Sequence, residues 1–368
     1  MIELRGVCKR FGDREVLRGL TLHVDRNEIL SVVGPSGCGK TTMLNIVAGL
    51  YPPDEGEVYI DGALVDGRVG RRRVHVMPAR RKRGYVFQSY ALFPHMRVEG
   101  NVSYGLKEMH LTKHEIKKQT RSLLEFVGLQ DRSDSHPYML SGGEQQRVAL
   151  IRSAATNPEV LLLDEPLAAL DPRIRDALKT DLKNRLKTLG MTCIYVTHNL
   201  AEAYAISDRM AVMGNGRIEQ IGRCDEVLER PSSRFVAEFL GFNVYEGRIS
   251  DVAADLVKIE IDSVEILADS VAGIVGGEVL VSLKPEDVAL TCEPAVRNEG
   301  WCGCTYNSLP GTVAEIVRMK SSAKVVVDVG FPIKSEVTLS CLKDLDLSEG
   351  KKVYVHFRSD SVSISRSL

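Results

Sequence analysis

The sequence has no long apolar run. None of its hydrophobic stretches approaches the ~18–20 residues that a helix needs to span a bilayer. The first residues, Met1–Arg5, also lack the charged and then apolar pattern of a secretory signal. We therefore expect a cytoplasmic chain, which would depend on other subunits for any step across a membrane.

Paired cysteines are missing as well. The eight cysteines are scattered, and none forms a C-x₂-C pair. Cys302 and Cys304 flank one glycine, but no second pair and no histidine partner completes a zinc set. This usage favours reduced thiols in a cytosolic protein.

The sequence also has no large excess of positive or negative charge. The formal net charge is −1, so the chain as a whole gives no electrostatic argument for nucleic acid as its main partner. Two basic clusters, 71–73 and 80–83, lack interleaved aromatic residues and favour a solvated loop over a nucleic-acid surface. Hydrophobic residues make up 44% and charged residues 26%, which suits an ordinary core, and 368 residues predict two domains.

The most informative segment is a glycine-rich turn that fits G-x-x-x-x-G-K-[ST], the phosphate-binding P-loop. Ile29–Val33 before it has the composition of a buried strand, and Met43–Ala48 after it has helical character. The glycines would let successive backbone N–H groups point at one anion, at the N-terminus of the helix. The P-loop comprises Gly34, Pro35, Ser36, Gly37, Cys38, Gly39, Lys40, Thr41 and Thr42.

Two side chains of the P-loop carry specific chemistry. Lys40 would reach the β- and γ-phosphates of a nucleoside triphosphate, and the Thr41 hydroxyl would bind Mg²⁺. A chance glycine-rich turn is the alternative, but the strand before the motif and the helix after it are the context that the motif requires. The sequence therefore predicts a site for a nucleoside triphosphate with Mg²⁺.

Three further apolar stretches, which suit central strands of a parallel sheet, end in polar residues. They are 85–87 followed by Gln88, 160–163 followed by Asp164 and Glu165, and 193–197 followed by His198. The segment Leu140–Arg147 contains Ser141, Gly142 and Gly143 and opens a helix that we expect to continue through Ala155.

The segment Leu140–Arg147 resembles the signature sequence of ABC-transporter ATPases, and it lies between the P-loop and the Asp164-Glu165 strand, as in that family. The likeness covers about residues 1–240 and includes seven elements in the family's order. Besides the P-loop and the signature, the elements that resemble the A-loop, Q-loop, Walker B, D-loop and H-loop are Phe11, Gln88, Asp164-Glu165, Leu170-Asp171 and His198.

The resemblance implies roles for these residues with ATP and Mg²⁺. Asp164 would hold Mg²⁺ through water opposite Thr41, and Gln88 would sense the ion or the water. Glu165 would polarise the attacking water, while His198 would orient it at the γ-phosphate. Lys40 would act with them, because phosphoryl transfer needs positioning and charge stabilisation more than covalent chemistry.

Phe11 keeps two interpretations: it stacks on the adenine, or it only packs at the edge of its turn. The resemblance also implies a head-to-tail homodimer. In it, Ser141, Gly142 and Gly143 of one chain cap the ATP held by the other chain's P-loop, with Asp171 of the D-loop also near the shared site. Opening and closing of the two halves would follow ATP binding and hydrolysis.

Further partners follow from the same resemblance. We expect two transmembrane permease subunits and, indirectly, an extracytoplasmic solute-binding protein, with this chain at the cytoplasmic face of the cell membrane. The alternative from a different class is a soluble ABC ATPase that acts on nucleic acid or ribosomes. That class usually carries two cassettes or a long coiled coil, and the sequence has one cassette and no heptad run.

The expected fold class is an α/β P-loop NTPase followed by an all-β OB-like domain. The ABC cassette would span 1–240, with a helical subdomain at about 89–157, and the β-rich domain 241–368. This second part resembles the TOBE or molybdate-binding-like (MOP-like) domains of import ATPases and would be regulatory. We expect Asn298–Pro310 to link two β-units. The strand candidates are 256–261, 279–283, 312–317, 324–329, 336–339 and 352–357.

The β-rich part also bears on the cargo. Lys284–Val288 resembles a segment common to import ATPases, and the pieces 243–247, 326–332 and 353–362 resemble molybdate or tungstate importers. Sulfate, iron(III), sugar or polyamine are the alternatives. One hypothesis places an inhibitory oxyanion contact at Lys320–Ser322 and Thr338; the alternative is a hydrophilic hairpin turn.

Overall fold

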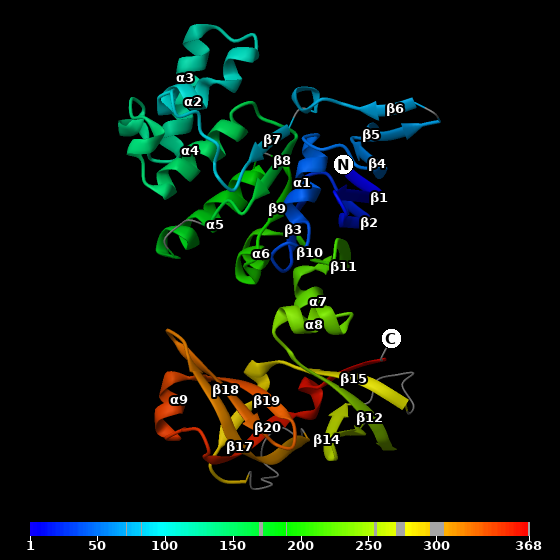
Figure 1. The fold of residues 1–368 in the computed structure, drawn as a ribbon. Helices are drawn as coiled ribbons and strands as arrows, with labels where there is room; N and C mark the ends of the chain where they lie inside the picture. The colour runs from blue at the N-terminus through cyan, green and yellow to red at the C-terminus, as the bar shows by residue number, and fades with distance from the viewer. Residues whose placement is uncertain are drawn as a thin grey trace. The chain divides into compact units, whose positions relative to one another are not determined.

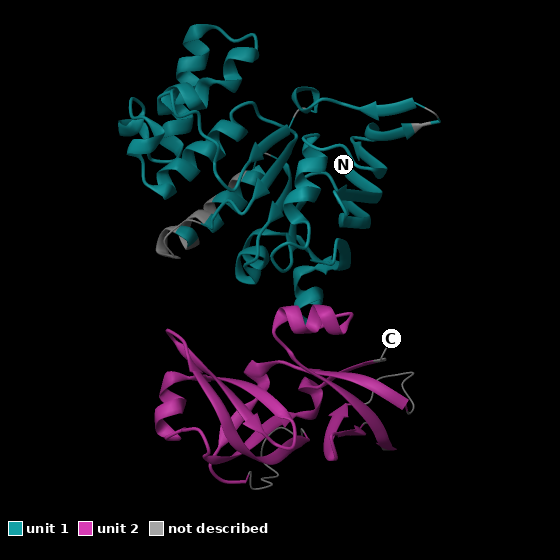
Figure 2. Cartoon of the chain, viewed as in Figure 1, with its two compact units in different colours: residues 1–229 teal, residues 230–368 magenta. Residues whose placement is uncertain are grey.

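In the computed structural model, the chain forms two compact units, Met1–Glu229 and Arg230–Leu368 (Figure 2). The structure describes residues 1–70, 72–81, 83–168, 172–188, 190–253, 256–269, 277–294 and 305–366. The domain boundary that the sequence predicted, between residues 240 and 241, lies inside the second unit. Helix α8 (Arg234–Leu240) belongs there, and its Arg234 forms an ion pair of 2.7 Å with Glu246 of strand β12 (Asn243–Ala253).

The first unit begins with an antiparallel sheet in the order β2-β1-β4-β5-β6. Apolar residues alternate along its first strand, so that Ile2, Leu4 and Val7 are buried against the core. The strands are β1 (Ile2–Phe11), β2 (Arg14–Val24), β4 (Glu55–Ile60), β5 (Ala63–Val69) and β6 (Arg72–His75).

The second sheet of this unit has the order β11-β10-β3-β9-β8-β7 and is parallel from β10 to β7. Every residue of β3, β8 and β9 is buried, as their continuous apolar sequences require for strands covered on both faces. The strands are β3 (Ile29–Val33), β7 (Arg83–Val86), β8 (Val160–Asp164), β9 (Thr192–Val196), β10 (Arg209–Gly214) and β11 (Arg217–Arg223).

Helix α1 (Lys40–Ala48) follows β3 after a loop of residues 34–39, while α2 (Val98–Ser103), α3 (Lys113–Phe126) and α4 (Gly142–Ala154) gather at one side of the unit (Figure 1). Capping boxes start α3 at Thr112 with Glu115 and α4 at Ser141 with Glu144. The remaining helices of the unit are α5 (Pro172–Thr188), α6 (Leu200–Ile206) and α7 (Cys224–Glu229). Short 3₁₀ helices are η1 (Pro78–Arg80), η2 (Gly105–Glu108), η3 (Gln130–Arg132) and η4 (Pro137–Met139).

The second unit contains two five-stranded antiparallel sheets, in the orders β14-β13-β12-β15-β21 and β16-β20-β17-β18-β19. Side chains of both sheets share one apolar core, including Ile259, Val281, Val325 and Val355. The strands besides β12 are β13 (Leu256–Ile261), β14 (Val264–Asp269), β15 (Gly277–Leu283), β16 (Ala289–Thr291), β17 (Tyr306–Arg318), β18 (Ser322–Asp328), β19 (Pro332–Thr338), β20 (Lys352–Arg358) and β21 (Ser363–Arg366).

Two expectations for the second unit need correction. Residues 306–310 of the expected linker belong to β17, which pairs with β20; Trp301, Cys302 and Cys304 lie outside the described residues. The expected strand at 336–339 ends at Thr338, which instead caps helix α9 (Leu339–Asp344). The short 3₁₀ helices η5 (Pro285–Asp287) and η6 (Ser359–Ser361) complete the unit.

The described residues of the two basic clusters, without Arg71 and Lys82, differ in part from the solvated loop that the sequence favoured. Arg72 and Arg73 lie in strand β6, paired with β5. Arg81 is fully buried, and its guanidinium pairs with the Asp66 carboxylate. The same group donates to main-chain oxygens of α1, at Ile46 (2.9 Å) and Val47 (3.0 Å). Arg81 thus caps the C-terminal end of the P-loop helix, where unpaired carbonyls favour a cation.

No helix among the residues that the structure describes is long and apolar enough to cross a bilayer.

Candidate nucleotide site

The P-loop lies between the end of β3 and the start of α1, as its sequence predicts. Gly37 and Gly39 have φ angles of 79° and 112°, in the region that favours glycine. A Cβ on Gly39 would lie 2.8 Å from a methyl carbon of Leu17, and one on Gly34 would lie 2.2 Å from the main-chain oxygen of Met213. The loop therefore requires these glycines both for its dihedral angles and for its close packing.

Lys40 is the first residue of α1 and is buried. Its ammonium donates to the main-chain oxygens of Gly34 (2.7 Å) and Pro35 (2.9 Å), so the side chain folds back across the loop. No carboxylate within the described residues forms an ion pair with it. The loop therefore holds an uncompensated positive charge beside a helix N-terminus, an arrangement that favours an anion.

Thr41 and Asp164 form the next part of the site. The Thr41 hydroxyl donates to the Asp164 carboxylate at 3.2 Å, and Asp164 is only 3% exposed at the end of β8. Burial raises the pKa of this carboxyl, and the charge of Glu165 adds to the effect, while Thr41 and Lys40 oppose it. A buried carboxylate in this setting gains stability from a cation.

This pair fits Mg²⁺. A hydroxyl and a carboxylate oxygen are the hard ligands that Mg²⁺ prefers, together with waters and phosphate oxygens. The described part of the chain contains no group of three or more His, Cys, Asp or Glu side chains placed to hold a metal alone. The protein donors are therefore few, as in sites where substrate phosphates share the ion.

Glu165 is the centre of a cluster at the C-terminal ends of three parallel strands. Its carboxylate lies 3.1 Å from Nδ1 of His198 and accepts from Nε2 of Gln88 at 3.4 Å. Its φ of 47° is rare for a residue with a side chain, and its main-chain N–H donates to Val196 at 2.9 Å. Such strained positions concentrate at functional sites.

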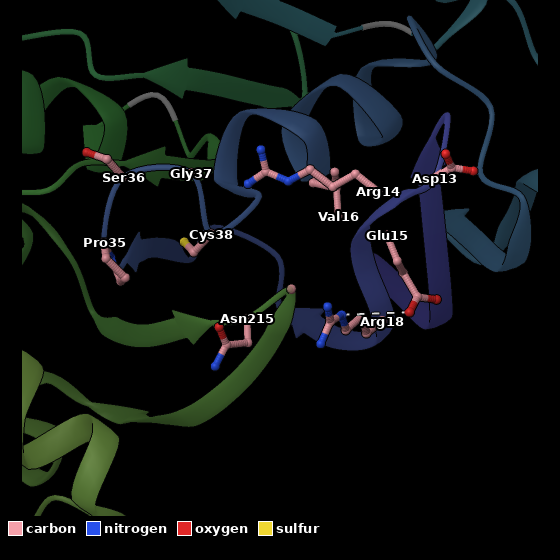
Figure 3. Close-up of a pocket in the computed structure, with 11 residues that line it drawn as sticks. Asp13, Arg14, Glu15, Val16, Arg18, Pro35, Ser36, Gly37, Cys38 and Asn215 are labelled. Atoms are coloured by element: carbon pink, nitrogen blue, oxygen red, sulfur yellow. Dashed lines mark ion pairs between the residues drawn. The ribbon is translucent and has the colours of Figure 1, made fainter.

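Two adjoining cavities border the P-loop. One, of about 390 Å³, is lined by Gln88, Glu165 and most of the P-loop; we call it the P-loop cavity. The other, of about 670 Å³, lies between the P-loop, the turn of β1 and β2, and the turn at Asn215 (Figure 3); we call it the outer cavity. The P-loop cavity brings Lys40, Thr41, Gln88 and Glu165 together as the sequence predicts.

The signature residues lie elsewhere. Ser141 accepts from the main-chain N–H of Glu144 at 3.4 Å and donates to its carboxylate at 2.9 Å, at the start of α4. Ser141, Gly142 and Gly143 line neither cavity. Helix α4, which these residues open, lies beside α2 and α3 (Figure 1). Asp171, the expected D-loop residue, lies outside the described residues.

Phe11 lies apart from both cavities. Phe11 is 44% exposed, packs edge-on against Tyr51 at 5.5 Å and lines neither cavity.

In the second unit, the Ser322 hydroxyl donates to the Glu336 carboxylate at 2.7 Å, and Thr338 caps α9. A carboxylate at Ser322 repels an oxyanion, so the geometry favours the hairpin turn over the oxyanion contact.

The family comparison agrees with this geometry. The family model described as "ABC transporter" matches residues 17–168. The spermidine/putrescine import ATP-binding protein PotA of Chromobacterium violaceum is 39% identical over 82% of this chain and 82% of its own length. The molybdate/tungstate import ATP-binding protein WtpC of Pyrococcus abyssi is 35% identical over 99% of this chain and 100% of its own length.

A third relative and a solved structure extend the comparison. The Fe(3+) ions import ATP-binding protein FbpC of Photobacterium profundum is 40% identical over 79% of this chain and 80% of its own length. The dimeric structure of the ATP-binding cassette MJ0796 in a post-hydrolysis state, bound to ADP and Pi, is 32% identical, with a TM-score of 0.55. It covers 61% of this chain and 99% of its own length.

Relatives at this identity, spanning most of both chains, settle the family, and their names favour import over the nucleic-acid alternative. The matched cassette fold confirms the predicted P-loop NTPase fold class, with a strand-rich second unit added. The chain belongs to the ABC transporter family, as an importer-type ATPase that binds ATP with Mg²⁺ and hydrolyses ATP.

Proposed function

We propose that the chain is the ATP-hydrolysing subunit of an importer and that Glu165 activates the attacking water. The cluster around Glu165 carries this proposal, because its carboxylate is held from two sides, by His198 and Gln88, at the edge of the P-loop cavity. A carboxylate positioned in this way can accept a proton from water, and His198 keeps its orientation.

In this mechanism the P-loop amides and Lys40 bind the phosphates. Thr41 and Asp164 would hold Mg²⁺, which neutralises charge on the phosphate oxygens when bound. Gln88 lies in the segment after β7 and contacts Glu165, so movement of that segment alters the position of the carboxylate. The chain therefore supplies positioning and electrostatic stabilisation.

We propose further that one chain supplies only half of each site, and that the signature of a second copy completes it. One support is that Ser141–Gly143 line neither cavity, so the signature serves no P-loop site within its own chain. The cassette MJ0796, which resembles this chain, is described as dimeric. Two permease subunits, a solute-binding protein and a place at the cytoplasmic face of the membrane belong to the same proposal.

Ser141→Arg tests the shared site, and Thr112→Arg is its matched control. Both residues are N-caps with the same capping box, at α4 and α3. If Ser141 caps a partner's ATP, its replacement blocks ATP turnover while ATP still binds, and Thr112→Arg leaves turnover near wild type. Normal turnover of the Ser141 variant, or equal loss in both variants, would reject the shared site.

We propose molybdate or tungstate as the cargo and a TOBE or MOP-like regulatory role for the second unit, over 241–368. The support is that WtpC, a molybdate/tungstate import protein, aligns with 99% of this chain, so that the likeness includes the second unit. Polyamine is the second candidate, favoured by PotA at 39% identity over 82% of this chain. Iron(III) has similar support from FbpC, at 40% identity over 79% of this chain, and sulfate and sugar rank below these.

Uptake by a strain that lacks this gene decides the cargo. We expect the strain to lose uptake of labelled molybdate and to regain it with the wild-type chain but not with Glu165→Gln. Loss of spermidine uptake, with molybdate uptake intact, would instead establish the polyamine alternative.

A further inference from the structure

Three exposed arginines surround the turn between β1 and β2, and one of them differs from the others. Arg10 and Arg18 both pair with the Glu15 carboxylate, at 3.3 Å and 3.7 Å. Within the described part of the chain, the Arg14 guanidinium has neither an ion pair nor a hydrogen bond. Its charge is therefore not used by the turn that carries it.

Arg14 stands at the boundary of the two cavities. It lines both the P-loop cavity and the outer cavity, whereas Arg18 lines only the outer one. Figure 3 shows its side chain reaching from the start of β2 toward Gly37. A Cβ placed on Gly37 would lie 3.8 Å from Nη2 of Arg14, so the guanidinium is next to the phosphate-binding turn.

The surrounding charges leave this position favourable for an anion. Glu15, the nearest carboxylate in the sequence on one side, is shared by Arg10 and Arg18. Asp13 on the other side lines the outer cavity but not the P-loop cavity. Lys40 approaches the loop from its inner side, through the carbonyls of Gly34 and Pro35. A second cation on the β2 side would face the same phosphates.

We propose that Arg14 binds the phosphate chain of the nucleotide, on the Gly37 side of the P-loop. The inference rests on the proposed function, in that the P-loop must hold the phosphates. A guanidinium suits this role because its planar N–H groups match two phosphate oxygens at once, which a lysine ammonium does not. Arg14 is thus a nucleotide-binding residue outside the sequence motifs, contributed by the β1–β2 turn.

Nucleotide affinity of Arg14→Ala tests the proposal, measured by calorimetry with Mg²⁺·ADP and Mg²⁺·GDP. We expect both affinities to fall about tenfold, which corresponds to ~1.4 kcal/mol. The two losses should be equal because the phosphate chains are identical. Arg14→Lys should recover part of the affinity. Arg18→Ala, which removes an exposed arginine of the same strand, should stay within about twofold of wild type.

Lys40→Ala separates this proposal from the proposed function. If Lys40→Ala loses nucleotide binding while Arg14→Ala binds as wild type does, the Arg14 contact is wrong and the P-loop assignment stands. If Lys40→Ala also binds normally, both are wrong. A loss for ADP but not for GDP would place Arg14 on the base. Equal losses of affinity in Arg14→Ala and Arg18→Ala would show that only the overall positive charge of the turn matters. The loss for ADP alone and the equal losses each overturn the proposal.

Discussion

The two units of this protein use their buried polar groups differently. In the second unit, Asn307 bonds the main-chain N–H and oxygen of Leu267, at 2.6 Å and 2.8 Å. Asn243 does the same with Lys334, at 2.8 Å and 2.9 Å. In the first unit, the polar side chains beside the P-loop converge on a cavity, where Glu165 is held in a strained backbone conformation.

The difference separates structural polar groups from those available to a ligand. An asparagine with both ends bonded to the main chain fixes one arrangement of strands and has little capacity left for a ligand. Asp164 and Lys40 instead carry charges whose full compensation requires an ion or a phosphate. Beside the P-loop, the incompletely compensated buried groups are charged, which suits a site for an ion and a phosphate.

The largest expected effect is on the first unit's cluster. Glu165→Gln keeps the size of the side chain but removes the proton acceptor, so we expect ATP turnover to fall by about 10²–10⁴-fold. ATP binding should stay close to wild type. Steady-state hydrolysis and equilibrium binding measure the two quantities. Glu159→Gln, an exposed glutamate directly before the same strand, is the control and should keep normal turnover.

A second substitution tests whether the first unit is also stabilised by a buried ion pair. Arg81→Met removes the buried partner of Asp66 and leaves that carboxylate with His75, at 2.6 Å. We expect a loss of about 3–5 kcal/mol in the free energy of unfolding of the first unit, because one buried charge loses its partner.

Calorimetry should show this loss as a lower unfolding temperature of the first unit. Arg80→Ala, at an exposed neighbour, should shift the transition little. An Arg81→Met protein as stable as wild type would show that this pair does not stabilise the unit.

A smaller effect belongs to the second unit. Asn307→Ala removes both bonds to Leu267, and we expect a loss of about 1–3 kcal/mol in stability of this unit. The KM for ATP should not change. Ser308→Ala, at the exposed next residue, is the control in the same unfolding measurement. A changed KM, with stability unaltered, would contradict the separation between the units.

The smallest effect concerns pH and His356. This histidine is buried, bonds Thr291 at 2.7 Å through Nε2 and has no partner for Nδ1 among the described residues. Burial lowers the pKa of its imidazole below the usual 6.5. The unfolded chain therefore binds more protons between the lowered pKa and about 6.5, so stability falls as the pH falls through that window.

This one imidazole changes the free energy of unfolding by at most about 1.4 kcal/mol per pH unit. Denaturation of wild type and His356→Gln at pH 7.5 and 5.5 measures it. The variant should lose less stability than wild type over this range; the same loss in both proteins would exclude His356 as its source.

The sequence predicted the elements whose signals are local. The apolar run Ile29–Val33 is strand β3 with the same bounds, and the apolar stretch 160–163 lies in strand β8. Most of the P-loop residues and Glu165 also lie at one cavity, because the P-loop and Glu165 each follow the end of a parallel strand.

The parts that it missed depend on contacts between distant segments. Arg81 looked like one more residue of a basic cluster, and only its contacts with Asp66 and α1 reveal that it is buried. Arg14 showed no motif, since its place at the P-loop comes from the fold. Helix α9 has a capping threonine at 338, but at Leu339–Asp344 it is too short to give a helical periodicity.

The central claim is that the P-loop of one chain and the signature of another form one site. An ATP analogue with a photoreactive group on its γ-phosphate tests this directly. A Glu165→Gln chain with an intact P-loop is mixed with a tagged Lys40→Ala chain, which lacks the P-loop lysine. We predict that the tagged chain is labelled at 141–147 only when the first chain is present. Labelling of the tagged chain when it is alone, or no labelling of its residues 141–147 in the mixture, would contradict the shared site.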